Sequence, residues 1–194
     1  GISFTLRRGE TFALVGESGS GKSMSALAVM GLLPFNATLS AQVLQLHDRD
    51  LLALSETMRQ SLRGGRIAMI FQDALTALNP VQRIGQQIEE VLLLHSKLSR
   101  AARKARVIEL LRQVELPEPA RRYHAYPHQL SGGQRQRAMI AMALAGEPSV
   151  LIADEPTTAL DVTIQAQILQ LLKALQQRYG MGLWLISHDL ALVA

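Results

Sequence analysis

Short runs of consecutive apolar residues recur along the chain, and helical patterns or polar turns separate them. Four of these runs read as buried strands, at residues 11–15, 67–71, 150–153 and 183–186. Unbroken apolar strands that alternate with helices are typical of a mostly parallel sheet with both faces covered. The sequence therefore predicts an α/β fold, and in such folds ligands gather at the carboxyl ends of the strands.

Apolar residues at helical spacing predict the helices that connect these strands. Pro34 is expected to end the first helix, Ser99 to cap a later one, and Gly180 to close the last. Pro117 and Pro119 should end the long helical stretch in the middle of the chain. The expected helices cover residues 24–33, 56–62, 84–116, 135–144 and 164–175.

Two segments in the first quarter of the chain alternate apolar and polar residues, which is the pattern of a half-exposed strand. They are residues 2–6 and 41–46, the second of which should turn back at residues 47–50. We expect these segments to form an antiparallel β edge beside the parallel sheet. Residues 123–129 contain proline and histidine and read as a loop.

The helical stretch without strands suggests how the chain is organised. We expect residues 1–74 and 146–194 to form an α/β core, with residues 75–145 inserted as a helical subdomain. Together they make a single domain over 1–194. The chain begins at Gly1 and ends inside a helical pattern at 189–194. We therefore expect a fragment of a longer protein, with both ends incomplete.

A glycine-rich stretch between the first strand and the first helix has the P-loop spacing G-x-x-x-x-G-K-[ST]. Its glycines let several backbone N–H groups point at one anion, and the helix adds the positive end of its dipole. The lysine supplies a cation for the outer phosphates, and the final serine can bind Mg²⁺. The phosphate-binding residues are expected to be Gly16, Glu17, Ser18, Gly19, Ser20, Gly21, Lys22 and Ser23.

Polar side chains follow the other predicted strands. Asp154 is placed to hold Mg²⁺, and Glu155 to orient or deprotonate an attacking water. Gln72 could bind either Mg²⁺ or that water through its side-chain oxygen. His188 could contact charge that develops on the terminal phosphate. Because the carboxyl ends of parallel strands share one rim, these residues should converge with the P-loop.

A second glycine-bearing turn, Leu130-Ser131-Gly132-Gly133-Gln134, lies just ahead of a predicted helix. Its N–H groups and the helix dipole again suit a phosphate. One monomer would not need two phosphate cradles for one nucleotide. The second cradle suggests a nucleotide held between two subunits.

The composition excludes several other kinds of site. The 194 residues include no cysteine, which excludes a disulfide framework, a thiolate zinc site and an iron–sulfur cluster in this segment. No apolar run approaches the ~18 residues that a membrane span requires. The net charge of +4 comes from scattered residues, and the one basic group, at residues 100–106, reads as the solvated start of a helix.

In this order, the motifs resemble those of the ATP-binding cassette family, called ABC below. Residues 130–134 match its LSGGQ signature letter for letter, and Gln72 stands where the family has its Q-loop residue. Ala159-Leu160-Asp161 matches the D-loop, and His188 matches the switch histidine. The resemblance covers almost the whole chain and implies a P-loop NTPase core.

The resemblance implies an ATPase that works in pairs, with ATP and Mg²⁺ as cofactors. ATP would lie between the P-loop of one domain and residues Ser131–Gln134 of the other, near Asp161. The partner domain would be an identical chain, a related chain or a tandem copy in the same chain. Glu155 would be the catalytic base, and transmembrane permease subunits would dock near Gln72 and the helical subdomain.

Three segments show a narrower likeness to ATPases of bacterial oligopeptide, dipeptide, glutathione and nickel importers: residues 71–80, 126–129 and 155–161. This likeness implies import of peptides or similar small solutes with a periplasmic or extracellular solute-binding protein. It also implies a peripheral location on the cytoplasmic face of the inner membrane. The adenine-stacking aromatic residue and the C-terminal extension of such proteins are expected outside this segment.

Three alternatives remain open at this point. Cassette ATPases of DNA repair carry coiled coils or zinc modules between the Q-loop and the signature, whereas this segment has neither sustained heptads nor cysteine. Translation-associated cassettes bind nucleic acid, which the residues after Gln72 argue against. An exporter ATPase is the third, although no membrane-spanning segment is fused within these residues.

Overall fold

A central sheet of four parallel strands organises the computed structural model, which describes residues 1–158 and 160–189. In the order in which they pair, the strands are β1 (Thr11–Val15), β6 (Gly182–Ser187), β5 (Val150–Asp154) and β4 (Ile67–Ile70). Neighbours in this order are distant in sequence, so each connection is a crossover outside the sheet plane. The four strands predicted from the apolar runs are formed, each within one residue at its ends. The prediction that all four are buried is wrong for β1, which among the described residues pairs on one side only and is exposed or half-buried along its length.

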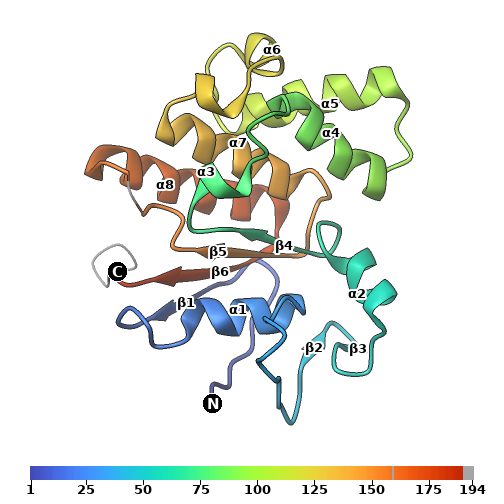
Figure 1. The fold of residues 1–194 in the computed structure, drawn as a ribbon, viewed down its shortest axis with the longest axis vertical. Coiled ribbons are helices and arrows are strands. Elements are labelled where there is room, and N and C mark those ends of the chain that lie inside the picture. The colour runs from blue at the N-terminus through green and yellow to red at the C-terminus, as the bar shows by residue number, and fades with distance from the viewer. Residues whose placement is uncertain (159, 190–194) are drawn as a thin grey trace.

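Helices cover both faces of the sheet, as the unbroken apolar strands predicted. Helices α7 (Gly132–Leu144) and α8 (Val162–Tyr179) lie on one face, and α1 (Lys22–Met30) lies on the other (Figure 1). Successive strand residues face opposite sides. In β5, for example, Leu151 packs with the α7–α8 side, whereas Ile152 packs with the α1 side.

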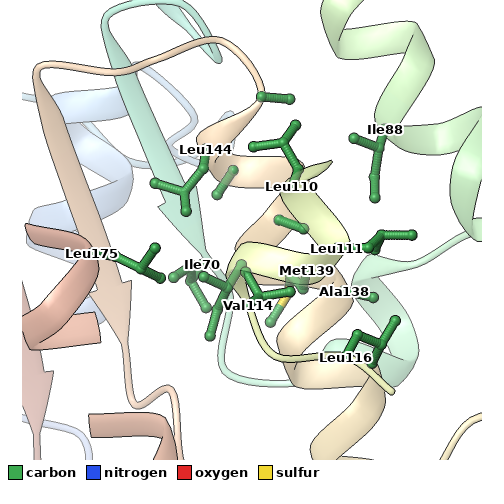
Figure 2. Packing of buried hydrophobic residues seen from close by; sticks show 14 of the residues in the cluster. Ile70, Ile88, Leu110, Leu111, Val114, Leu116, Ala138, Met139, Leu144 and Leu175 are labelled. Carbon is green, nitrogen blue, oxygen red and sulfur yellow. The ribbon is translucent and has the colours of Figure 1, made fainter. Parts of the chain in front are cut away.

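Buried hydrophobic residues form one cluster on each face of the sheet, and the helical region of the chain belongs to the larger one, on the α7–α8 side. Helices α4 (Ile84–His95) and α5 (Arg100–Gln113) pack on α7, which in turn packs on the sheet (Figure 1). Figure 2 shows Ile70 of β4, Met139 of α7 and Leu175 of α8 among the side chains of this cluster. The buried residues form one continuous cluster from the sheet to the outer helices. The division into an α/β core and a helical subdomain at residues 75–145 stays a prediction.

The antiparallel strands are shorter than the sequence pattern predicted. The expected strand at residues 41–46 is reduced to β2 (Gln45–Leu46), and β3 (Arg49–Asp50) occupies part of the expected turn. His47 turns the chain with a φ of 51°. This hairpin is separate from the parallel sheet, and α2 (Glu56–Leu62) follows it with the predicted bounds.

The strand expected at residues 2–6 is not formed. No strand of the described residues pairs with this segment, so its alternating apolar and polar residues form no part of a sheet. The segment is instead held by side-chain packing. The ring of Phe4 stacks on Phe12 at 4.2 Å between centroids and meets the edge of Trp184 at 4.8 Å.

Several helix ends also differ from the sequence prediction. Helix α1 ends at Met30 because Gly31 adopts a left-handed φ of 66°, three residues before the proline expected to stop it. Helix α6 (Pro119–Arg122) starts at Pro119, which suits the first turn because it lacks an N–H. The short helix α3 (Ala74–Ala77) and a 3₁₀ turn at Pro127–Gln129 were not predicted.

Other helix signals are confirmed. The Ser99 side chain caps α5 by accepting a hydrogen bond from the Ala102 N–H, and Gly180 ends α8 in a left-handed conformation. The helix expected at residues 189–194 falls almost wholly outside the described residues. Within residues 1–158 and 160–189, no helix has both the length and the apolar character needed to cross a membrane.

Candidate nucleotide-binding site

The P-loop curls between the carboxyl end of β1 and the start of α1. Gly19 and Gly21 adopt φ values of 82° and 88°, a region that residues with a Cβ rarely enter. A Cβ on Gly16 would lie 3.1 Å from the Ser20 hydroxyl. The loop therefore depends on glycine both for its turn and for its close packing at the N-terminus of α1.

Lys22 lies beneath this loop and is only 7% exposed. Its Nζ donates to the carbonyl oxygens of Gly16 and Glu17, both at 2.8 Å. An ammonium group has three N–H donors, so these two bonds leave one for a phosphate oxygen. The lysine thus braces the loop and keeps a positive charge at its centre.

The first long-range contact of the site joins the P-loop helix to β5. The hydroxyl of Ser23 donates to Asp154 Oδ1 at 2.9 Å, across the rim of the sheet. No group of three or more His, Cys, Asp or Glu side chains in the described residues could hold a metal by itself. A hydroxyl beside one carboxylate instead fits Mg²⁺, which takes few protein oxygens and completes its shell with phosphates and water.

Burial raises the pKa of the Asp154 carboxyl above its ordinary value. The hydrogen bond from Ser23 and the charge of Lys22 oppose this rise, and the negative charge of Glu155 adds to it. Asp154 is only 5% exposed, so the ionised form of its carboxyl is costly to bury. A cation bound at this point would favour the ionised form.

Three hydrogen bonds converge on one oxygen of Glu155. Gln72 Nε2 and Thr158 Oγ1 each donate to Oε2 at 3.0 Å, and His188 Nδ1 lies 3.2 Å from the same atom. No hydrogen bond found among the described residues uses Oε1. The carboxylate is therefore held by one oxygen while the other can accept a proton. Gln72 forms no hydrogen bond with Ser23 or Asp154.

The backbone at Glu155 is strained, with a left-handed φ of 45°. The Glu155 N–H donates to the Ile186 carbonyl at 3.0 Å, and the Thr158 N–H donates to the Glu155 carbonyl at 3.1 Å. These bonds hold the turn that follows β5. Non-glycine residues in this conformation cluster at functional sites, where the surrounding structure imposes it.

The contact of Thr158 was not anticipated from the sequence. The available signal was the spacing of Glu155 and Thr158 in a turn, which lets a hydroxyl reach back to the carboxylate three residues earlier. That spacing has other common uses, so only the folded turn identifies the contact.

The signature residues cap α7 rather than joining the P-loop of the same chain. Ser131 Oγ accepts from the Gln134 N–H, and Gln134 Oε1 accepts from the Ser131 N–H. This capping box fixes a partly exposed turn on the face of the sheet opposite α1 (Figure 1). No hydrogen bond or ion pair between described residues links Ser131–Gln134 with the P-loop.

The signature turn packs closely on the start of α8. A Cβ on Gly132 would lie 3.3 Å from the Leu160 side chain, and one on Gly133 would lie 2.9 Å from Ile164. Asp161 caps α8 by accepting from the Ile164 N–H at 3.0 Å. The predicted D-loop and signature are therefore adjacent. Ala159, the first D-loop residue, lies outside the described residues.

Comparisons with known proteins agree with this geometry. A family model described as ABC transporter matches residues 1–158. The chain is 54% identical to the dipeptide transport ATP-binding protein DppD of Escherichia coli (strain K12), over 100% of this chain and 59% of that protein. It is 52% identical to the oligopeptide transport ATP-binding protein OppD of Bacillus subtilis (strain 168), over 100% of this chain and 54% of that protein.

Among solved structures, the cassette MJ0796 in a dimeric post-hydrolysis state bound to ADP and Pi is similar at 31% identity. The TM-score is 0.84, and the match covers 97% of this chain and 79% of that one. The chain therefore belongs to the ABC transporter family, as its motifs predicted. Its narrower likeness to dipeptide and oligopeptide transport ATP-binding proteins is also confirmed. The chain spans less than two thirds of the length of these curated relatives.

Replacing the buried carboxylate should stabilise the domain. A raised pKa means that the folded state binds more protons than the unfolded chain, so the free energy of unfolding falls as pH rises through that window. We expect the free energy of unfolding of Asp154→Asn at pH 7.5 to exceed that of the parent by roughly 0.5–2 kcal/mol. The gain should vanish below the ordinary carboxyl pKa. Urea denaturation without nucleotide measures it.

The matched control is Asp48→Asn, which removes an exposed carboxylate in the hairpin turn and should change stability little. A lower unfolding free energy for Asp154→Asn at pH 7.5 would contradict the desolvation argument. An equal gain in both variants would instead assign the effect to net charge.

Proposed function

We propose that this chain is the ATP-binding and ATP-hydrolysing part of a subunit that powers import of peptides or similar small solutes across a membrane. The observation that carries the proposal is the convergence of Gln72, Thr158 and His188 on Glu155, beside the P-loop and the Ser23–Asp154 pair. The support for the transport role is the likeness to dipeptide and oligopeptide transport proteins along the whole chain.

The P-loop residues Gly16–Ser23 bind the phosphates of ATP in this proposal. Backbone N–H groups and Lys22 hold the β- and γ-phosphates, and Ser23 and Asp154 hold Mg²⁺. When bound, Mg²⁺ neutralises charge on the transferring phosphate. Gln72 is a further proposed ligand of the metal or of the attacking water through its side-chain oxygen, which its bond to Glu155 leaves free for that role.

Glu155 acts as the general base. Its Oε2 is anchored by three neighbours, so Oε1 is the atom that takes the proton from water. Because a carboxylate held in one orientation needs no reorganisation, the anchoring itself favours catalysis. His188 is exposed on the rim and contacts both Glu155 and the charge that develops on the terminal phosphate.

The second half of the ATP site comes from a partner cassette. Residues Ser131–Gln134 form a partly exposed, capped turn that no hydrogen bond or ion pair of the described residues links to the P-loop of their own chain, and Asp161 lies beside them. MJ0796, whose fold is similar, is dimeric in its ADP-bound form. ATP between two cassettes draws them together, and hydrolysis releases them.

Permease subunits convert this closure into transport, and a solute-binding protein delivers the solute. The protein is then peripheral on the cytoplasmic face of the membrane. The exposed apolar side chains of Phe71, Leu75 and Val81, which lie within nine residues of Gln72 in sequence, suit a contact with membrane subunits. Functions in DNA repair or translation, and export, are less well supported, because the two relatives named above are peptide transport proteins.

The variant Glu155→Gln should separate ATP binding from turnover. Removing the base should slow hydrolysis by roughly 100-fold or more while leaving the P-loop intact. In the full-length protein, Mg-ATP should then trap a cassette dimer, which size-exclusion chromatography with light scattering measures. Glu90→Gln, an exposed glutamate on α4, is the control and should behave as the parent. Unchanged hydrolysis would exclude Glu155 as the base.

The hydroxyl of Thr158 should matter for turnover but not for binding. Thr158→Val keeps the shape of the side chain and removes one donor to Glu155, so we expect kcat to fall about tenfold with little change in KM. Thr158→Ser keeps the donor and should recover most of the rate. Equal rates in the Val and Ser variants would show that the hydrogen bond has no part in catalysis.

The transport role needs the whole protein in its native membrane. We expect the tagged full-length subunit to co-purify with hydrophobic permease subunits, and its deletion to abolish uptake of labelled di- or oligopeptides. The parent gene should restore uptake, and the Glu155→Gln variant should not. Recovery of ribosomes or DNA in place of permeases would overturn the transport role and leave the ATPase role standing.

A further inference from the structure

A cavity of about 480 Å³ lies at the end of the sheet opposite the nucleotide-binding rim. Its walls include Arg66, Ser149 and Met181, which directly precede or adjoin the amino ends of β4, β5 and β6. The β2–β3 hairpin contributes another wall. In Figure 1 this hairpin lies toward the amino ends of β4, β5 and β6. Because all four strands are parallel, this cavity and the P-loop lie at opposite ends of the strands.

Positive charge dominates the lining. Arg8, Arg49 and Arg66 all border the cavity, and none forms an ion pair with a carboxylate of the described residues. One acidic residue, Glu147, also borders it, but its Oε1 accepts from Arg106 at 3.0 Å. Three arginines on the walls of one cavity give it a positive charge, which favours an anion there.

Hydrogen bonds fix the wall between the hairpin and the sheet. Ser149 Oγ donates to the Arg66 carbonyl at 3.0 Å and lies 3.1 Å from His47 Nε2. Because the Ser149 hydroxyl donates its one hydrogen to the Arg66 carbonyl, it accepts the Nε2–H of His47. The hairpin turn is thereby tied to the starts of β4 and β5, and the cavity has a defined shape.

The backbone around the cavity is strained at two positions. His47 and Glu147 have left-handed φ values of 51° and 53°, which disfavour residues with a Cβ. Both residues line the cavity. Glu155 in the nucleotide site shares this conformation, so the described residues carry such strain at both ends of the sheet.

We propose that this cavity binds a small anion that carries two or more phosphate groups, held by Arg8, Arg49 and Arg66. A guanidinium group matches the geometry of phosphate oxygens and remains charged at any physiological pH. The volume falls within the ~300–1,000 Å³ of small-molecule sites. The apolar side chains of Leu46, Leu62 and Met181 complete the walls. The inference does not depend on the proposed ATPase or transport roles.

The test uses the full-length protein with the P-loop disabled by Lys22→Ala, so that the nucleotide site does not capture the probe. Isothermal titration with inorganic pyrophosphate, without divalent cations, should show one site per chain whose affinity falls as salt rises. Adding Arg49→Ala or Arg66→Ala should weaken binding at least tenfold. Both residues are exposed and the hydrogen bonds found for Arg66 use its backbone, so melting temperatures should confirm intact folds.

The matched control is Arg121→Ala on α6, which removes the same charge from an exposed arginine paired with Glu118. Absence of pyrophosphate binding, or equal loss in the Arg121→Ala control, would overturn the proposal. Co-sedimentation with vesicles that contain cardiolipin, whose headgroup carries two phosphates, against phosphatidylcholine vesicles, identifies the source of the phosphate. Vesicle binding that needs Arg49 and Arg66 and that pyrophosphate displaces would support a lipid headgroup, and binding of pyrophosphate alone would support a free metabolite.

Discussion

Parallel pairing of β4, β5, β6 and β1 is the constraint on which the rest of the molecule depends. The hydrogen-bonded register of these strands, rather than contacts between loops, brings the four carboxyl ends to one rim. The P-loop, Gln72, Asp154 with Glu155, and His188 each follow one of these ends. Any shift of one strand relative to its neighbour would separate the hydroxyl of Ser23 from Asp154, and Gln72 and His188 from Glu155.

The rim is built at a cost to stability. Asp154 is a buried carboxyl whose pKa is raised by desolvation, and Glu155 has a backbone conformation that an unconstrained residue would avoid. The apolar clusters on both faces of the sheet offset these costs, because side chains such as Ile70, Met139 and Ile152 are fully or almost fully buried. A rigid, well-packed sheet is what allows unfavourable groups to be held in fixed positions.

In the proposed pair of cassettes, the two halves of the ATP site lie on different surfaces of the molecule. The P-loop opens at the start of α1, while the capped turn at Ser131 opens at the start of α7 on the other side of the sheet. A nucleotide that needs both turns must therefore contact two copies of the fold. The basic cavity at the amino ends of the strands is separate from both surfaces, so occupation of one does not obstruct the other.

Local patterns alone account for most of the elements. Consecutive apolar residues identified the four strands, Ser99 identified the start of α5, and the spacing of glycine, lysine and serine identified the P-loop. The family and its peptide-transport branch also followed from short motifs. The errors arose where a local signal lacked a partner: residues 2–6 alternate like a strand but pair with none, and the hairpin is shorter than the alternation at residues 41–46.

Other features were decided only by tertiary structure. The sequence determined which residue types follow each strand, since backbone geometry and side-chain chemistry at these positions are local properties. It did not determine that Thr158 donates to Glu155, that Asp154 is buried enough to raise its pKa, or that Arg8, Arg49 and Arg66 border one cavity. Each of these depends on distances between atoms and on exclusion of water, which exist only once the strands have paired and the helices have covered them.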